Sequence, residues 1–261
     1  MFRLTREVRF AINDTPDDQL AGKPTNSFGG FPSLTGFGYF LPIRVSLVTG
    51  DLNPQSNYVV NIKQIDEAVR DYMSEVVEMF HSETLTVPKV LYHLHSMLYD
   101  LWRERFESVT LALSPFQTMS IYRSECPMVR LSQKFEFSAS HRLHNPALSA
   151  DANVQTYGKC NNPHGHGHNY EVQVTLAGRP DSRGVLVDVP AMERAVNAAV
   201  IDRFDHKNLN EELPEFKNLI PTVENIAMTI FQLLKPRFEG AGKLASVTVW
   251  ETPKTWCEYS E

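Results

Sequence analysis

The segment Leu131–His141 reads LSQKFEFSASH, and its apolar residues occupy alternate positions. Because successive side chains of a β-strand point to opposite faces of a sheet, Phe135, Phe137, Ala139 and His141 would share one face. The pattern therefore predicts a half-buried strand whose buried face ends in a histidine.

The same pattern occurs near the start of the chain, where Leu4–Phe10 reads LTREVRF. Two further similarities follow in the same order: Ile43–Leu47 (IRVSL) with Val172–Leu176 (VQVTL), and Ser108–Pro115 (SVTLALSP) with Ser246–Pro253 (SVTVWETP). Internal similarity at matching spacing indicates a repeated structural unit. The sequence thus predicts two domains, residues 1–125 and residues 126–261.

The second copy contains the signals of a complete small fold. Further strands are expected over His166–Leu176 and over 244–251. Between them lie two helices, one after Pro190 and one that opens at Thr222, a residue type that caps helix N-termini. The apolar side of the first helix is formed by Met192, Ala195, Val196, Ala199 and Val200. Each copy therefore reads as an antiparallel four-stranded sheet with two helices on one face, the α+β class.

Bulk composition is that of a globular protein. Of 261 residues, 42% are apolar and 21% are charged, and the net charge of −6 argues against a nucleic-acid partner bound through a broad basic face. No apolar run approaches the roughly 20 residues that cross a bilayer, and the N-terminus lacks the apolar core of a signal peptide. Three cysteines, an odd number, do not suggest a disulfide framework. We expect a cytoplasmic protein without membrane association.

A histidine-rich segment carries the chemistry: Gly158–Tyr170 reads GKCNNPHGHGHNY. In a strand, residues two apart point the same way, so that His166 and His168 can converge on one ion. Imidazole is a common zinc ligand, and a catalytic zinc keeps three protein ligands beside an open position. His141 is the natural third ligand, and His164 is a spare. The alternative is a histidine-rich loop that binds no metal.

Several motifs together resemble the 6-pyruvoyl-tetrahydropterin synthase family. They are Phe137–Leu143, Gly158–Tyr170, Asp205–Leu209, Thr222 with Glu224–Asn225, and Val249–Thr252. The resemblance covers essentially all of residues 130–261, with the motifs in the family's order. It implies a tunnelling fold (T-fold), here two units in tandem.

The resemblance also implies a zinc site and a proton relay. The residues that match the family's zinc ligands are His141, His166 and His168. The zinc would chelate the side-chain hydroxyls of 7,8-dihydroneopterin triphosphate. Cys160 matches the general base, and Asp205 with His206 matches the pair that completes the relay. On the residues alone, Cys160 could be a packing residue, but its loop of Gly, Lys, Asn and Pro is hardly core. Asp205 and His206 could be a helix C-terminal cap with a surface pair.

The substrate ring would be held by a carboxylate. Glu251 matches the glutamate that accepts hydrogen bonds from the pterin's adjacent amino and ring N–H groups, although it would face solvent if its strand lay at an edge. Thr222 and Glu224 cap their helix first, and any contact with the pterin is secondary.

The first copy has lost all of these groups. Aligned on the repeat, Asp14 stands opposite His141, Phe37 and Tyr39 opposite His166 and His168, Phe31 opposite Cys160, and Leu113 opposite Glu251. We expect a structural unit in which Phe37 and Tyr39 fill the former pocket.

Two related reactions compete, and a third possibility is not catalytic. Elimination of triphosphate gives 6-pyruvoyl-tetrahydropterin, whereas loss of acetaldehyde gives 6-carboxy-tetrahydropterin, a step of queuosine and deazapurine biosynthesis. Five residues separate Cys160 from His166, as in the pyruvoyl type, but His164 would satisfy the shorter spacing of the carboxy type. A non-catalytic pterin-binding scaffold is the remaining alternative. By analogy with the family, we expect a homo-oligomer of ring-closed T-fold units with active sites between subunits.

Overall fold

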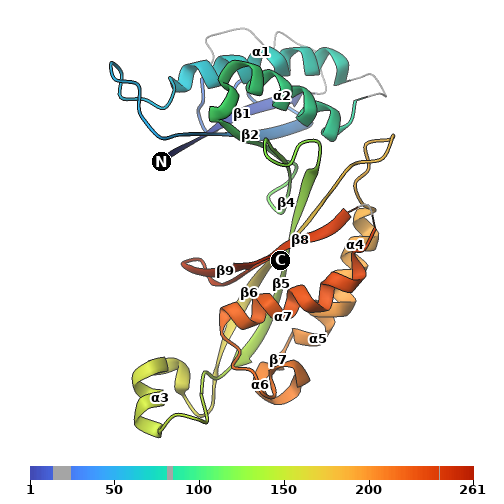
Figure 1. Cartoon of the computed structure of the whole chain (residues 1–261). Coiled ribbons are helices and arrows are strands. Elements are labelled where there is room, and N and C mark those ends of the chain that lie inside the picture. Colours follow the sequence, from blue (N-terminus) through green and yellow to red (C-terminus); the bar gives the residue numbers. More distant parts are fainter. Residues whose placement is uncertain (14–24, 81–84, 241) are drawn as a thin grey trace. The chain divides into compact units, whose positions relative to one another are not determined.

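The computed structural model describes residues 1–13, 25–80, 85–240 and 242–261, which form two compact units (Figure 1). The first unit comprises Met1–Leu131 and Arg179–Val185, and the second comprises Ser132–Gly178 and Leu186–Glu261. Each unit is described by itself.

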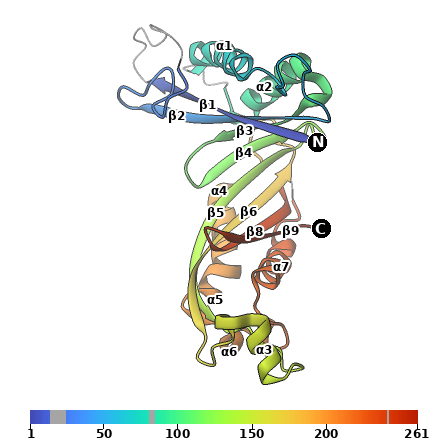
Figure 2. The ribbon, with the colours of Figure 1, turned by 90° about the vertical axis from the view of Figure 1, so that its left-hand side faces the viewer.

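The first unit is an antiparallel sheet with two helices on one face (Figures 1 and 2). Its elements are β1 (Phe2–Asn13), β2 (Gly38–Thr49), α1 (Ile62–Phe80), α2 (Val87–Trp102), a 3₁₀ turn (Arg103–Arg105), β3 (Phe106–Ala112) and β4 (Gln117–Tyr122). The strands pair in sequence order, with Phe10 opposite Leu41 and Val45 opposite Val109. The sequential order of strands leaves both helices in one connection, between β2 and β3.

The second unit repeats this order of elements with additions. Its strands are β5 (Val129–His141), β6 (His166–Gly178), β7 (Lys207–Asn208), β8 (Gly242–Thr252) and β9 (Thr255–Tyr259). Its helices are α3 (Ala150–Tyr157), α4 (Val189–Val196), α5 (Asp202–Phe204), α6 (Leu209–Glu212) and α7 (Val223–Leu234), with a π turn (Asn197–Ile201) and 3₁₀ turns (Gly158–Asn161, Pro214–Phe216, Lys235–Arg237). The sheet order is β5-β6-β8-β9, and the short β7 pairs in parallel with β5.

The alternation expected in β5 and β6 is confirmed. Phe137, Ala139 and His141 are buried on one face of β5, whereas Phe135 is only half-buried. On β6, Tyr170 and Val172 continue the parity of the histidines and are fully buried. These residues form the core face of the sheet, because side chains two apart along a strand share one side.

The expected helices are also present. The helix after Pro190 runs through α4, the π turn and α5, and its buried residues include Met192, Val196 and Val200. Thr222 caps α7 as expected, because its side chain accepts from the backbone N–H of Asn225 at 3.4 Å. The helix then packs against β8 and β9. The second unit is therefore α+β, as the sequence predicts.

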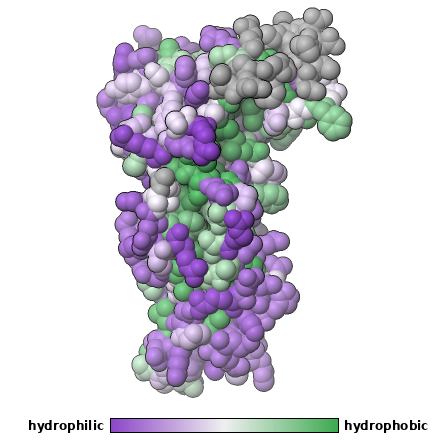
Figure 3. Space-filling view, turned by 90° about the vertical axis from the view of Figure 1, so that its right-hand side faces the viewer, coloured by the Kyte–Doolittle hydropathy of each residue, from purple (hydrophilic) through white to green (hydrophobic). Residues whose placement is uncertain are grey.

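Several elements of the second unit escape the sequence analysis, among them α3, α6 and β7. Helix α3 buries only Asn153, a polar residue, so that it has no apolar stripe to reveal it. The end of the unit that carries α3 and α6, at the bottom of Figures 1 and 3, has a largely hydrophilic surface. Among the described residues, no helix is long and apolar enough to span a membrane.

One expectation for the first unit is wrong. Phe37 is 95% exposed and Tyr39 is 57% exposed, so these two side chains do not fill a pocket. Phe37 precedes β2 and Tyr39 is its second residue, at the exposed end of the strand. Asp14, expected opposite His141, lies outside the described residues.

Candidate metal centre

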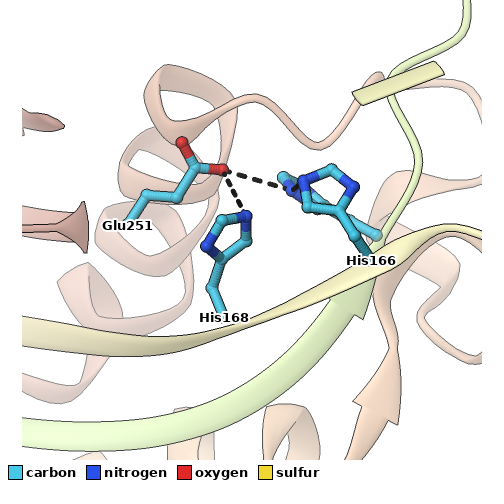
Figure 4. Close-up of side chains that lie close together, drawn as sticks. His166, His168 and Glu251 are labelled. Atoms are coloured by element: carbon cyan, nitrogen blue, oxygen red, sulfur yellow. Dashed lines mark hydrogen bonds and ion pairs between the residues drawn. The ribbon is translucent and has the colours of Figure 1, made fainter. Parts of the chain in front are cut away.

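Four potential metal ligands converge on the core face of the second unit. They are His141 at the end of β5, His166 and His168 at the start of β6, and Glu251 near the end of β8. Their ligand atoms all lie within 4.8 Å of one another, and Figure 4 shows the carboxylate of Glu251 directed at the imidazole rings. Among the residues that the structure describes, no second cluster of this kind was found.

The sheet explains why residues so distant in sequence meet. β5, β6 and β8 are neighbours in the sheet, so that each strand brings its ligands to the same end. Glu171 pairs with Trp250, which places Glu251 opposite Tyr170, two residues along β6 from His168. Cross-strand neighbours on one face lie about 5 Å apart, which is within reach of a glutamate side chain.

The proton on His141 is positioned by the backbone. This ring is fully buried, and its Nδ1 atom lies 2.7 Å from the carbonyl oxygen of Pro221, to which it donates. The Nε2 atom then carries the lone pair and lies 3.1 Å from Nε2 of His166 and 3.2 Å from Oε1 of Glu251. A carbonyl that holds the remote ring nitrogen is the usual support of a metal-binding histidine.

Three of the distances between these ligand atoms match the spacing around a tetrahedral cation such as zinc. The distance between Nε2 of His168 and Oε1 of Glu251 is 3.4 Å, close to the two distances at His141. Four ligands bonded to zinc at about 2.0–2.1 Å lie roughly 3.3–3.4 Å from one another. Without a positive charge between them, nitrogen lone pairs and a carboxylate at these distances repel one another. The donor set thus suits zinc.

Burial prepares the side chains for this role. It lowers the pKa of His166 and of His168, and the neighbouring His141 contributes in the same direction. Contact with His141 lowers the pKa of Glu251, against the opposing effect of its partial burial. These shifts favour the neutral imidazoles of His166 and His168 and the ionised carboxylate of Glu251, the forms that bind a divalent cation.

Cys160 is not part of this cluster. It belongs to the 3₁₀ turn after α3 and is half-buried, and its carbonyl oxygen accepts from the backbone N–H of Leu143 at 2.9 Å. That bond fixes the turn two residues beyond His141. Burial raises the pKa of Tyr170, with smaller contributions from Glu251 and Cys160. The thiol of Cys160 is therefore near enough to Tyr170 to affect it electrostatically.

Asp205 and His206 form a hydrogen-bonded pair at the N-terminal side of β7. Oδ2 of Asp205 lies 2.7 Å from Nδ1 of His206, and the backbone of β5 holds both residues. The N–H of Ser138 donates to Oδ1 of Asp205 at 2.8 Å, and its carbonyl oxygen accepts from the N–H of His206 at 2.6 Å. The bond from Ser138, followed by that from His206, lowers the pKa of Asp205.

The pair is not brought into the cluster. Neither Asp205 nor His206 hydrogen-bonds any of the four clustered side chains in the described structure, and the side chain of His206 is 83% exposed. His206 instead lines an open pocket of about 530 Å³ together with Ser138, Asn169 and His168. His168 therefore contributes to both the cluster and this pocket.

The remaining predicted residues lie at the margin. Thr222 is the N-cap of α7, and Glu224 is exposed in the first turn of that helix. His164 is also exposed, and its backbone N–H donates to the side chain of Asn162, so it lies outside the cluster.

The family of the chain follows from a match to residues 130–261, where the model of a family described as 6-pyruvoyl tetrahydropterin synthase fits. The chain belongs to this family. The 6-pyruvoyl tetrahydropterin synthase match begins within β5 and includes all four clustered residues.

Individual members of the synthase family are similar over about half of the chain. The 6-pyruvoyl tetrahydrobiopterin synthase of Drosophila melanogaster is 39% identical over 137 residues, which are 52% of this chain and 82% of that protein. The solved structure of the 6-pyruvoyl tetrahydropterin synthase of Caenorhabditis elegans is 38% identical with a TM-score of 0.50, and covers 52% of this chain and 96% of that one. The 6-carboxy-5,6,7,8-tetrahydropterin synthase of Haemophilus influenzae is 27% identical, over 51% of this chain and all of that protein.

Sequence reasoning missed two residues of the candidate site. Tyr170 is fully buried, stacks on Phe137 with ring centroids 4.9 Å apart, and presents an edge to the rings of His141 and His168. Its parity with His168 in β6 was the available signal. The carbonyl of Pro221 carried no signal, because a backbone acceptor leaves no trace in the residue type.

Proposed function

We propose that the second unit is a zinc-dependent synthase that converts 7,8-dihydroneopterin triphosphate to 6-pyruvoyl-tetrahydropterin with elimination of triphosphate. Membership of the 6-pyruvoyl tetrahydropterin synthase family supports the pterin chemistry. The observation that carries the metal dependence is the convergence of His141, His166, His168 and the carboxylate of Glu251, whose ligand atoms all lie within 4.8 Å of one another.

Each residue of the cluster has a proposed role. His141, His166 and His168 would hold the zinc, which, when bound, supplies Lewis-acid polarisation of the substrate's side-chain oxygens. Glu251 would accept two hydrogen bonds from adjacent donors of the pterin ring, and this fixes the ring's orientation. Thr222 and Glu224 act mainly on α7, whose N-terminus adjoins the Pro221 carbonyl that orients His141.

The proton transfers fall to Cys160 and the Asp205–His206 pair. Cys160 would take the proton from the substrate's side chain, since it matches the family's general base and is not one of the clustered ligands. Asp205 accepts from Nδ1 of His206, which leaves Nε2 of that ring to exchange protons. We place this pair in the site of another copy of the chain, because it makes no hydrogen bond to its own cluster and His206 faces solvent.

Such an arrangement requires an oligomer. An open antiparallel sheet has edges with unpaired backbone groups, and closing several sheets into a ring pairs them. We propose a homo-oligomer of T-fold units. Residues 1–125 would be a degenerate repeat that shares the order of elements, carries no cluster among its described residues, and contributes structure rather than chemistry.

The 6-carboxy-tetrahydropterin synthase activity is the second candidate. The similarity to the Haemophilus influenzae protein favours it, as does the ambiguity of the spacing created by His164. Because His164 is exposed and outside the cluster, the spacing is counted to His166, and this supports the pyruvoyl reaction. A pterin-binding scaffold without activity would not require the retained Cys160 and Asp205–His206 pair.

The deciding experiment is product identification by mass spectrometry after the zinc-loaded protein is incubated with 7,8-dihydroneopterin triphosphate. Pyruvoyl-tetrahydropterin with released triphosphate is the expected result. Carboxy-tetrahydropterin with acetaldehyde would assign the second reaction. A protein with zinc and bound pterin that forms neither product would be a scaffold.

A further inference from the structure

A large groove lies in the first unit, between helices α1 and α2. The two helices lie side by side on the sheet (Figures 1 and 2), and the groove between them has a volume of about 1450 Å³. Along α1 its lining runs from Gln64 to Glu75, which is about 17 Å, or roughly three turns, of helix. Pockets for single small molecules commonly occupy roughly 300–1,000 Å³. The groove therefore has the size for a segment of polypeptide.

One part of the groove is apolar and open to solvent. Met97 and Leu101 line it from α2, and Val59 and Val60 line it from the connection between β2 and α1. Leu101 is 53% exposed, and Tyr58, which also lines the groove, is 58% exposed. Apolar side chains gathered in an open groove are stabilised when another apolar surface covers them.

The α1 wall of the groove carries a row of carboxylates. Glu67, Asp71 and Glu75 follow one another at intervals of four residues, which places them on one face of the helix. All three are exposed, and none of them makes an ion pair or a side-chain hydrogen bond with the residues that the structure describes. Like charges at this spacing destabilise a helix. Nothing in the described structure offsets this repulsion.

The face of α1 that packs on the sheet, by contrast, neutralises its charge. Asp66 accepts two hydrogen bonds from Arg6, at 2.7 and 2.8 Å, and Arg70 lies 4.0 Å from the same carboxylate. In the groove, the described lining residues include one arginine and no lysine. That arginine, Arg105, donates from Nη1 to the carbonyl oxygen of Val59 at 3.2 Å. The groove is therefore acidic as well as partly apolar.

An aromatic side chain lies beside the carboxylates. Tyr72 of α1 stacks on His93 of α2 with ring centroids 6.1 Å apart, and both residues line the groove. Burial, followed by the negative charge of Glu75, raises the pKa of Tyr72 to about 12. An aromatic ring next to carboxylates is a surface that attracts the side chains of lysine and arginine.

We propose that the groove between α1 and α2 is a docking site for a basic amphipathic helix of a partner protein. Lysine or arginine side chains four residues apart on that helix would pair with Glu67, Asp71 and Glu75, and its apolar side would cover Leu101. Charge complementarity favours a basic segment, because an acidic one would be repelled. The first unit would then recruit a partner, a role separate from the chemistry of the second unit.

The test measures binding of a designed helical peptide to the full-length protein by isothermal titration calorimetry. The probe carries lysine at three positions four residues apart and leucine on the adjacent face, and a matched peptide carries glutamine in place of lysine. A groove variant removes three charges with little change of shape: Glu67→Gln, Asp71→Asn and Glu75→Gln.

The matched control removes three exposed charges outside the groove: Asp51→Asn, Asp151→Asn and Glu239→Gln. Leu101→Ala tests the apolar part of the groove separately.

We expect the lysine peptide to bind the wild-type protein and the control variant equally well, and the glutamine peptide to bind neither. The groove variant should lose affinity by about 3- to 100-fold, the effect of three exposed ion pairs. Raising the salt concentration from about 0.05 M to about 0.5 M should weaken wild-type binding and reduce this difference. Leu101→Ala should weaken binding by about 3- to 10-fold, since about half of its side chain remains to be covered.

Three results would overturn the proposal. The first is no saturable binding of the lysine peptide to the wild-type protein. The second is an equal loss of affinity in the groove and control variants, which would show that binding follows net charge and not the groove. The third is a sedimentation coefficient that changes in the groove variant but not in the control, which would show that a second copy of this chain fills the groove. None of these variants alters the candidate metal centre, so that the outcome is independent of product identification.

Discussion

His141 donates the hydrogen of Nδ1 to the carbonyl oxygen of Pro221 over 2.7 Å, and Pro221 immediately precedes the N-cap of α7. The start of this helix therefore orients a candidate metal ligand that lies on a different element. The two functions assigned to this stretch, capping and ligand support, are mechanically connected.

Thr222→Ala should weaken both the cap of α7 and the support of His141. Loss of the bond from the Asn225 N–H to the Thr222 hydroxyl should cost about 1 kcal/mol of unfolding free energy and loosen the Pro221 carbonyl. Zinc affinity, measured by chelator competition, should fall with it. Ser149→Ala removes the equivalent cap of α3 and should leave zinc affinity unchanged. Equal zinc affinities in Thr222→Ala and Ser149→Ala would show that the cap of α7 does not support the orientation of His141.

His168→Ala should abolish stoichiometric zinc binding, because it removes one of three histidine ligands and leaves the two remaining imidazoles with Glu251 alone. Metal content after dialysis, measured by mass spectrometry, is the readout. His164→Ala is the control, since His164 is exposed and should retain full occupancy. Full zinc content in His168→Ala would refute the ligand assignment.

Cys160→Ala should separate binding from turnover. The thiol is not among the clustered ligands, so zinc content and pterin affinity should stay within about twofold of wild type. Turnover should fall by about 10²–10⁴, the contribution usual for a positioned general base. A variant with an unchanged rate would remove Cys160 from the role of base.

Mixing two inactive variants tests whether the relay acts between copies. Cys160→Ala and His206→Ala should each be nearly inactive, and co-expressed chains should recover part of the activity. Recovery is expected because some sites would combine an intact Cys160 with an intact His206 from a neighbour. Mixed oligomers without activity would instead place Asp205 and His206 at the cluster of their own chain.

The first unit should lose stability in mild acid through His95. Burial lowers the pKa of this residue on α2, and its Nε2 atom is buried without a hydrogen-bond partner in the structure. The unfolded chain then binds the proton more readily than the folded one, so stability is complete above about pH 6.5 and declines as the pH falls toward the lowered pKa. His95→Leu should reduce this dependence in thermal unfolding between pH 5 and pH 8 (approximate limits around the reference pKa of histidine). An unchanged pH profile would assign the dependence to other groups.

Much of the second unit could be predicted from its strands, because period-two patterns place residues on faces without further information. Within β6, parity places His166 and His168 on one side of the sheet, and the structure brings His141, a third candidate ligand, to the same cluster. The same parity argument could not place Glu251 among them. The distance between the Glu251 carboxylate and the histidines depends on which strands are neighbours and on the direction in which a flexible side chain turns.

The first unit shows the limit of arguing from a lost motif. Phe37 and Tyr39 stand where ligands are expected, and apolar residues there suggest a filled pocket. They are exposed instead, since β2 begins at Gly38 and no described element covers its start. Similarly, Asp205 and His206 are adjacent in sequence to a helix end, but only the pairing of β7 with β5 explains why they are held so firmly.

The two bonds from Ser138 to Asp205 and His206 have a wider consequence. Ser138 lies three residues before His141 on the same strand, so that the relay pair and a candidate metal ligand share one rigid segment of backbone. Insertions elsewhere in the chain can lengthen loops without changing the spacing of these groups. A single-residue insertion or deletion between positions 138 and 141 would disturb both together. Insertions and deletions should therefore be tolerated in the loops around β5 far more readily than within residues 138–141, the last four residues of that strand.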